Sequence, residues 1–125
     1  MSVVIVTVVS ASLTKDNDWV GKMDPYAVLE VSGQKFQTQV ASGQGQNPAW
    51  NQQFSFTVNQ NAQLTIRVYD DDVGPDEFIG EAHVNLQAHT QQGNNEQALP
   101  ITSKHGKPAG QIRIRVEGNL GQQHY

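Results

Sequence analysis

Two short acidic segments are the part of this chain best suited to do chemistry. One spans residues 15–24 and the other spans residues 70–77, and together they hold eight of the twelve Asp and Glu residues. Carboxylates gathered on loops supply the hard oxygen ligands that Ca²⁺ prefers. Neither segment has the alternating acids, central glycine and distal glutamate of a single-loop calcium site. We therefore expect a calcium site here to draw its ligands from both segments.

The elements that must position these segments are β-strands. Apolar residues recur at every second position, which is the period of a strand. Ranges with this alternation are 4–13, 26–31, 35–40, 50–58, 64–69, 79–86, 97–101 and 111–116. Eight short strands with polar turns between them indicate an all-β fold, an eight-stranded antiparallel β-sandwich. Each acidic segment follows a strand, and we expect the two loops to leave adjacent strands and meet at one end.

Length and composition narrow the class of protein. The chain has 125 residues, which predicts one domain over residues 1–117, with residues 118–125 as a flexible tail or the start of a linker. Without cysteine there is no disulfide and no thiolate metal site. A net charge of −4 argues against nucleic-acid binding, which needs a basic face. No nucleophile elbow or histidine cluster accompanies the acids, so we predict no enzyme activity.

Four aspartates are the first candidate ligands. Asp18 and Asp24 lie in the first loop, and Asp70 and Asp72 point the same way if strand geometry persists past residue 70. The alternative interpretations are an ordinary turn at Asp24 and a solvated hairpin tip at residues 70–72. Trp19, in the first loop, either folds back onto the sandwich or inserts among lipid headgroups, where indole rings are favoured. Trp50 is expected to be a packing residue.

The chain resembles the C2 domain family, a calcium- and lipid-binding module, over about residues 3–117. The resemblance lies in the order and spacing of five stretches. They are VTVVSASL at 6–13, MDPYA at 23–27, NPAWNQQFSF at 47–56, VYDDD at 68–72 and FIGE at 78–81. It implies the permuted, type II topology, in which the strand at 111–116 takes the place of an absent leading strand.

The resemblance also implies a ligand set. Carboxylates would come from Asp18, Asp24, Asp70 and Asp72, and backbone carbonyls from near Asn17 and Asp71. The family's last acidic ligand falls on Glu77 rather than the usual aspartate, in a loop one residue short, so Asp76 could substitute for it. We expect two Ca²⁺ ions, within a range of one to three.

A family resemblance of this kind implies a function. We expect calcium-dependent binding of a monomer to anionic, phosphatidylserine-like membranes, with peripheral recruitment from the cytoplasm when calcium rises, in signalling or vesicle trafficking. Membrane contacts are expected from Trp19, Val20, Lys22 and Val73, with help from Met23. The alternative is a calcium-independent domain that binds protein partners, which the short loop at residues 70–77 and Glu77 favour.

Overall fold

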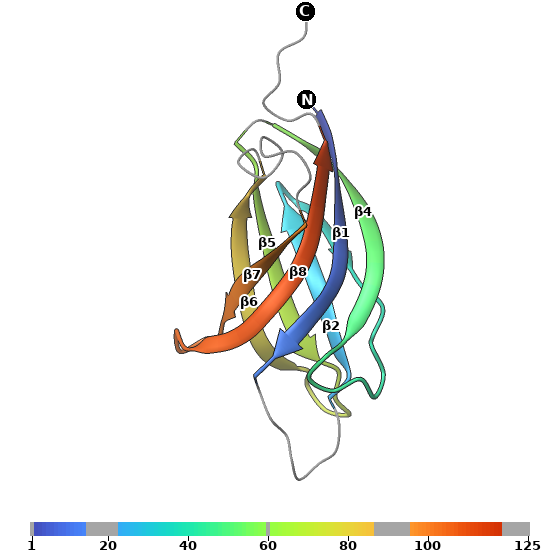
Figure 1. The fold of residues 1–125 in the computed structure, drawn as a ribbon, viewed down its shortest axis with the longest axis vertical. Helices are drawn as coiled ribbons and strands as arrows, with labels where there is room; N and C mark the ends of the chain where they lie inside the picture. Colours follow the sequence, from blue (N-terminus) through green and yellow to red (C-terminus); the bar gives the residue numbers. More distant parts are fainter. Residues whose placement is uncertain (1, 15–22, 60, 87–95, 119–125) are drawn as a thin grey trace, which may run out of the picture.

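The computed structural model describes residues 2–14, 23–59, 61–86 and 96–118. Within these ranges the elements are antiparallel strands (Figure 1). They are β1 (Ser2–Leu13), β2 (Pro25–Val31), β3 (Gln34–Gln37), β4 (Ala49–Val58), β5 (Gln63–Asp70), β6 (Glu77–Asn85), β7 (Glu96–Thr102) and β8 (Pro108–Gly118). The predicted all-β fold is confirmed.

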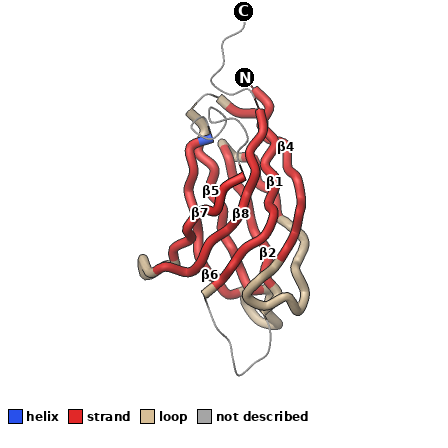
Figure 2. Tube along the Cα trace, in the orientation of Figure 1, coloured by secondary structure: helices blue, strands red, loops and turns tan. Residues whose placement is uncertain are grey.

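The strands form two layers in the order β3-β2-β5-β6 and β7-β8-β1-β4. The layers join where β6 meets β7, through the single register pair Glu81 and Thr102. In Figure 1, β8, β1 and β4 pass in front of β2 and β5, and Figure 2 shows the connecting loops gathered at the ends of the strands. The closing strand β8 lies between β7 and β1, which is its expected position in the type II topology.

Alternation along the strands builds the core between the layers. In β5, Leu64, Ile66 and Val68 are completely buried, whereas Thr65 and Arg67 are half-buried on the other face. Side chains of successive strand residues point to opposite faces, so a period of two sorts apolar from polar groups. Among the residues that the structure describes, Phe56 is the largest fully buried side chain, and Trp50 packs against this core as predicted.

Several predicted boundaries differ from the strand ends in the structure, among them the end of the third strand and the start of the tail. The third strand was expected to reach residue 40, but β3 ends at Gln37. The amide of Ala27 donates to the hydroxyl oxygen of Thr38 at 2.9 Å instead of to a backbone carbonyl. The regular ladder of backbone hydrogen bonds therefore stops at this residue. Gly118, which we assigned to the tail, is the last residue of β8. The rest of the tail, residues 119–125, lies outside the described residues.

Gln34 ties together the edge strands of the two layers. Its side-chain amide donates to the carbonyl of Thr57 at 2.7 Å and accepts from the amide of Thr57 at 3.0 Å. This reproduces a backbone pair of a sheet across the open edge between β3 and β4. The two layers of the sandwich are therefore connected both at the β6–β7 junction and at this edge.

Candidate metal centre

The loop after β5 and the segment entering β2 lie at the same end of the sandwich. This is the lower end in Figure 1, opposite the start of β1 and the end of β8. Proximity comes from strand pairing, since Pro25 lies opposite Asp70 in the β2–β5 register. Our expectation that the two loops leave adjacent strands is wrong, because β1 pairs with β4 and β8 rather than β5. It is the final part of the first loop that meets the other acidic loop.

Backbone hydrogen bonds join Asp24 to the acidic residues that end β5. The amide of Asp24 donates to Oδ1 of Asp70 at 2.9 Å. In the opposite direction, the amide of Asp71 donates to the carbonyl of Asp24 at 3.0 Å. Asp70 is only 7% exposed, whereas Asp71 is exposed and Asp24 is half-buried. The structure thus brings three acidic residues from the two segments into direct contact.

A third segment, residues 38–48, is attached to the same point. The amide of Gly43 donates to Oδ1 of Asp24 at 2.6 Å. Gly43 has a φ of 70°, a left-handed conformation that glycine adopts without steric cost. The amide of Gly45 donates to the carbonyl of Met23 at 2.9 Å, and the Trp50 indole donates to the carbonyl of Pro25 at 3.2 Å. These bonds attach Asp24 and its chain neighbours to residues 43–50.

The loop between β5 and β6 is organised by Asp76. Its Oδ1 accepts from the amide of Asp72 at 3.1 Å, and its Oδ2 accepts from the hydroxyl of Tyr26 at 2.5 Å. Asp72 in turn accepts from the amide of Val73 at 2.8 Å. Strand geometry does not persist to Asp72, because β5 ends at Asp70. The shared direction of Asp70 and Asp72 therefore does not follow from strand periodicity.

Sequence reasoning did not identify Tyr26 or Gly43 as parts of this site. Tyr26 stands two residues after Asp24, and a tyrosine on the strand beside an acidic loop was the only available indication. Its ring stacks on Tyr69 with centroids 5.5 Å apart, so it also belongs to the packing of β2 against β5. Gly43 offered no indication, since glycine in a Gly/Gln-rich loop usually marks only a turn.

The acidic residues shift one another's ionisation. Burial raises the pKa of the Asp70 carboxyl group, against the effect of the hydrogen bond from the Asp24 amide. The negative charges of Asp24, Asp72 and Glu77 raise it further. The pKa of Asp71 is also raised, by partial desolvation and then by the charge of its neighbours. Neutralising this end of the molecule is therefore favourable in the folded state.

Asp76 behaves in the opposite way. The hydrogen bonds from the Tyr26 hydroxyl and the Asp72 amide favour its charged form and hold its pKa below the usual range. Burial, followed by the Asp76 carboxylate, raises the pKa of the Tyr26 hydroxyl, so this phenol stays a donor at neutral pH. Asp76 is thus the stable anion of the loop, and Tyr26 fixes its position.

The raised pKa of Asp70 predicts that the contribution of this one carboxyl group to the stability of the calcium-free protein increases in mild acid. A folded-state pKa above the ordinary value of 3.8 gives a contribution that is present below 3.8 and is lost as the pH rises through the folded value. We expect wild type to gain stability relative to Asp70→Asn as the pH falls from neutral toward 4. Urea unfolding in chelator measures this difference, and a difference that does not change with pH would contradict the assignment.

Oxygen donors of this kind suit a hard cation such as Ca²⁺. By themselves, the described ranges contain no group of three or more His, Cys, Asp or Glu residues that could hold a metal ion. Five predicted residues lie within 15–22, outside the described residues: Asn17, Asp18, Trp19, Val20 and Lys22.

Two apolar residues expected at a membrane are placed differently by the fold. Val73 is 104% exposed on the β5–β6 loop, beyond the last carboxylate of the VYDDD stretch. Met23 is 3% exposed and belongs to the core cluster, so its predicted role in membrane contact is wrong. In the part of the chain that the structure describes, no helix has the length and apolarity needed to cross a bilayer.

The fold and this site define a class of protein, a β-sandwich with carboxylates concentrated on the loops at one end. The family model for the C2 domain matches residues 2–101, and the chain belongs to the C2 domain family. C2 domains are generally non-catalytic modules.

Relatives and solved structures agree with this membership. Elicitor-responsive protein 3 of Oryza sativa subsp. japonica is 37% identical over 111 residues, covering 87% of this chain and 77% of the relative. Extended synaptotagmin-1 of Mus musculus is 33% identical over 78% of this chain, which matches 9% of that protein. A solved C2 domain-containing protein superposes with a TM-score of 0.79 at 30% identity, covering 98% and 91% of the two chains. A calcium-bound structure of two C2 domains of extended synaptotagmin 2 shares the fold, with a TM-score of 0.80 at 23% identity over 94% of this chain and 45% of that one.

Proposed function

We propose that this C2 domain binds Ca²⁺ where Asp24 meets the end of β5 and is thereby recruited to anionic phospholipid membranes. The observation that carries the proposal is the pair of hydrogen bonds that link the backbone of Asp24 to the Asp70 carboxylate and to the Asp71 amide, since they bring acidic residues of two segments together. The proposed ligands are the carboxylates of Asp18, Asp24, Asp70 and Asp72, carbonyls near Asn17 and Asp71, and Asp76 or Glu77 as the last acid. We propose two ions, within the range of one to three.

Charge neutralisation is the proposed mechanism. Carboxylates about 5 Å apart repel by roughly 3 kcal/mol per pair at an effective dielectric near 20. Burial is the main cause of the raised pKa of Asp70, and the charges of Asp24, Asp72 and Glu77 add to it. Two Ca²⁺ ions would bring four positive charges to a chain of net charge −4, leaving about zero. An anionic lipid surface would then no longer be repelled at this end of the domain.

The proposed membrane face contains the apolar and basic residues of the same loops. Val73 is fully exposed on the β5–β6 loop, where it is available to a headgroup layer. Trp19, Val20 and Lys22 are proposed to act beside it from the first loop. A monomer in the cytoplasm would bind peripherally through this face when calcium rises, with phosphatidylserine-like lipids as its partners.

Two measurements test this function. A ligand that binds only the folded state raises the melting temperature, so millimolar calcium is expected to raise Tm relative to chelator. In the second measurement, the protein is sedimented with phosphatidylserine vesicles, and calcium is expected to increase the pelleted fraction. An unchanged melt together with equal pelleting in calcium and in chelator would exclude the proposed function.

One observation favours the second candidate function, a calcium-independent domain that binds protein partners. Both carboxylate oxygens of Asp76 already accept hydrogen bonds within the protein, from Asp72 and Tyr26. A loop held together in this way is ordered without a cation. The melt distinguishes the two candidates, because this second function predicts the same Tm with and without calcium.

A further inference from the structure

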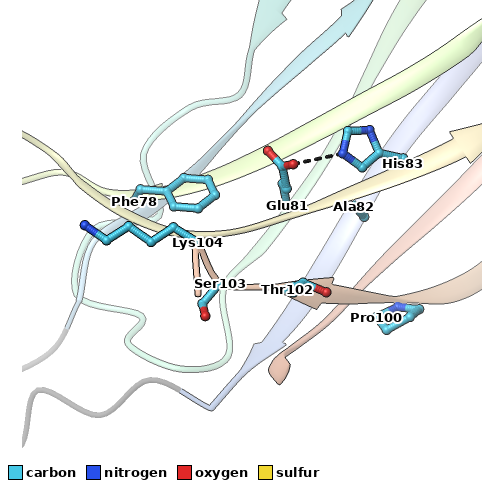
Figure 3. Close-up of a pocket in the computed structure, with 8 residues that line it drawn as sticks. All are labelled: Phe78, Glu81, Ala82, His83, Pro100, Thr102, Ser103 and Lys104. Carbon is cyan, nitrogen blue, oxygen red and sulfur yellow. Dashed lines mark hydrogen bonds and ion pairs between the residues drawn. The ribbon is translucent and has the colours of Figure 1, made fainter. Parts of the chain in front are cut away.

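A groove lies between the start of β6 and the turn that joins β7 to β8. It has a volume of about 590 Å³, and its lining includes Phe78, Ile79 and Ala109 on the apolar side and Lys104 and Lys107 on the polar side. An adjoining cavity of about 450 Å³ shares Phe78, Ser103 and Lys104 with it. Figure 3 shows Lys104 running alongside Phe78, with its ammonium group pointing away from the Glu81–His83 pair.

The lining of this groove carries two lysines and one carboxylate, Glu77, and the two lysines form no ion pair within the described part of the protein. The three arginines of the chain all form ion pairs: Arg67 with Glu30 and Glu81 at 3.3 Å, and Arg113 and Arg115 with Glu96 at 3.6 and 2.9 Å. Among the described residues, no such pair involves the exposed ammonium groups of Lys104 and Lys107. Within the described ranges, these two cations therefore have no carboxylate at ion-pair distance.

The turn that carries the two lysines is held in shape by its own backbone. The amide of Ser103 donates to the carbonyl of Lys107 at 2.8 Å, and the amide of Gly106 donates to the carbonyl of Ser103 at 2.9 Å. Gly106 has a φ of 78°, the left-handed conformation that closes the turn. The Ser103 hydroxyl accepts from the Lys107 amide at 3.3 Å and keeps its own O–H as a donor. Such a pre-ordered set of donors binds with less loss of conformational entropy.

We propose that this groove, which we call the β7–β8 groove, binds the phosphate of an anionic lipid headgroup without calcium. Lys104 and Lys107 contact the phosphate oxygens as compact point charges, and the Ser103 hydroxyl donates a hydrogen bond to them. The apolar wall of Phe78, Ile79 and Ala109 accommodates the glycerol part of the lipid.

The location of the groove favours a lipid over a free phosphate ion. Its lining includes Glu77, the first residue after the β5–β6 loop, so it opens beside the end where Val73 is fully exposed. The inference that the phosphate belongs to a lipid rests on the proposed function, because that function turns this end of the domain toward a membrane. The inference that the groove binds phosphate does not depend on the proposed function. The acidic loops oppose an approaching anion, so we expect this binding to be weaker in chelator than in calcium.

Vesicles in chelator provide the direct test. The protein is titrated with phosphatidylcholine vesicles that contain phosphatidic acid, and binding is compared for wild type, Lys104→Gln, Lys107→Gln and the double variant. Each lysine near an anionic surface contributes roughly fivefold, so we expect about a 25-fold loss in the double variant. Lys35→Gln is the matched control, because Lys35 is exposed on β3 and lines neither cavity. We expect it to bind like wild type.

Two outcomes would overturn the proposal. The first is wild-type vesicle binding by the double variant. The second is a loss of binding in Lys35→Gln as large as in either single groove variant, which would mean that only the net charge of the protein governs vesicle binding. Inorganic phosphate, titrated while amide resonances of residues 103–109 are followed by NMR, separates the two sources of phosphate. Shifts with phosphate but no vesicle binding would overturn the lipid source. The calcium-induced rise in Tm is measured on the same double variant and should remain, so a failure of the groove is distinguishable from a failure of the calcium site.

Discussion

Asp72→Asn is expected to lower calcium affinity about tenfold or more and, at the same time, to stabilise the calcium-free protein. The affinity falls because a charged oxygen ligand becomes a neutral one, and ligand charge sets calcium affinity. Stability rises because Asp72 is one of the negative charges acting on Asp70 and Asp71. The amide of Val73 loses little, since the Asn side-chain oxygen accepts the same hydrogen bond. Calorimetric titration and urea unfolding in chelator measure the two effects.

Asp76→Asn is the matched comparison in the same loop. Its carboxylate is favoured by the Tyr26 hydroxyl and the Asp72 amide, so removing the charge is expected to destabilise the calcium-free protein. The two Asp→Asn variants should therefore differ in sign when calcium is absent. If both variants lose stability in chelator, mutual repulsion does not govern this loop. If both keep wild-type calcium affinity, neither the Asp72 nor the Asp76 carboxylate is a calcium ligand.

Gly110→Ala is expected to destabilise the fold by about 3 kcal/mol or more. A Cβ at residue 110 would lie 2.1 Å from the carbonyl oxygen of Ser12 and 2.9 Å from Cα of Leu13. Both contacts are with backbone, so β1 and β8 would have to separate where Gly110 pairs with Leu13. A φ of 119° adds strain for any residue with a side chain. Urea unfolding measures the loss.

Gly106→Ala separates the steric effect from the backbone strain. Gly106 also has a left-handed φ, 78°, but a Cβ there would meet nothing within 4 Å. Its loss is expected to be about 1 kcal/mol, the cost of the left-handed conformation alone. Equal losses at residues 106 and 110 would show that close approach of β1 and β8 does not limit position 110.

The strands were predictable because their cause is local. Leu64, Ile66 and Val68 alternate with polar residues, and this alternation predicts that their side chains are buried. The third strand was predicted too long because the competing acceptor, the Thr38 hydroxyl, acts across space on Ala27. Strand ends depend on such tertiary bonds, which the period of the sequence does not contain.

The candidate site shows the same limit. Acidic composition identified Asp24, Asp70 and Asp72 as residues of interest, but the partners that position them come from other segments. The Gly43 amide reaches Asp24 and the Tyr26 hydroxyl reaches Asp76, across 19 and 50 residues of sequence. Met23 was interpreted as a surface residue because it stands in a polar stretch, yet it is buried in the core.

By itself, then, the order of residues determined the all-β class, the inward and outward faces of the strands and the concentration of negative charge in two loops. Each of these follows from residue type and spacing along one strand or loop. Only the tertiary structure decided which strands are neighbours, so that Asp24 meets Asp70 through β2 rather than β1. The physical reason is that hydrogen bonds and charge repulsion act over distances in space, and folding alone brings distant segments within that range.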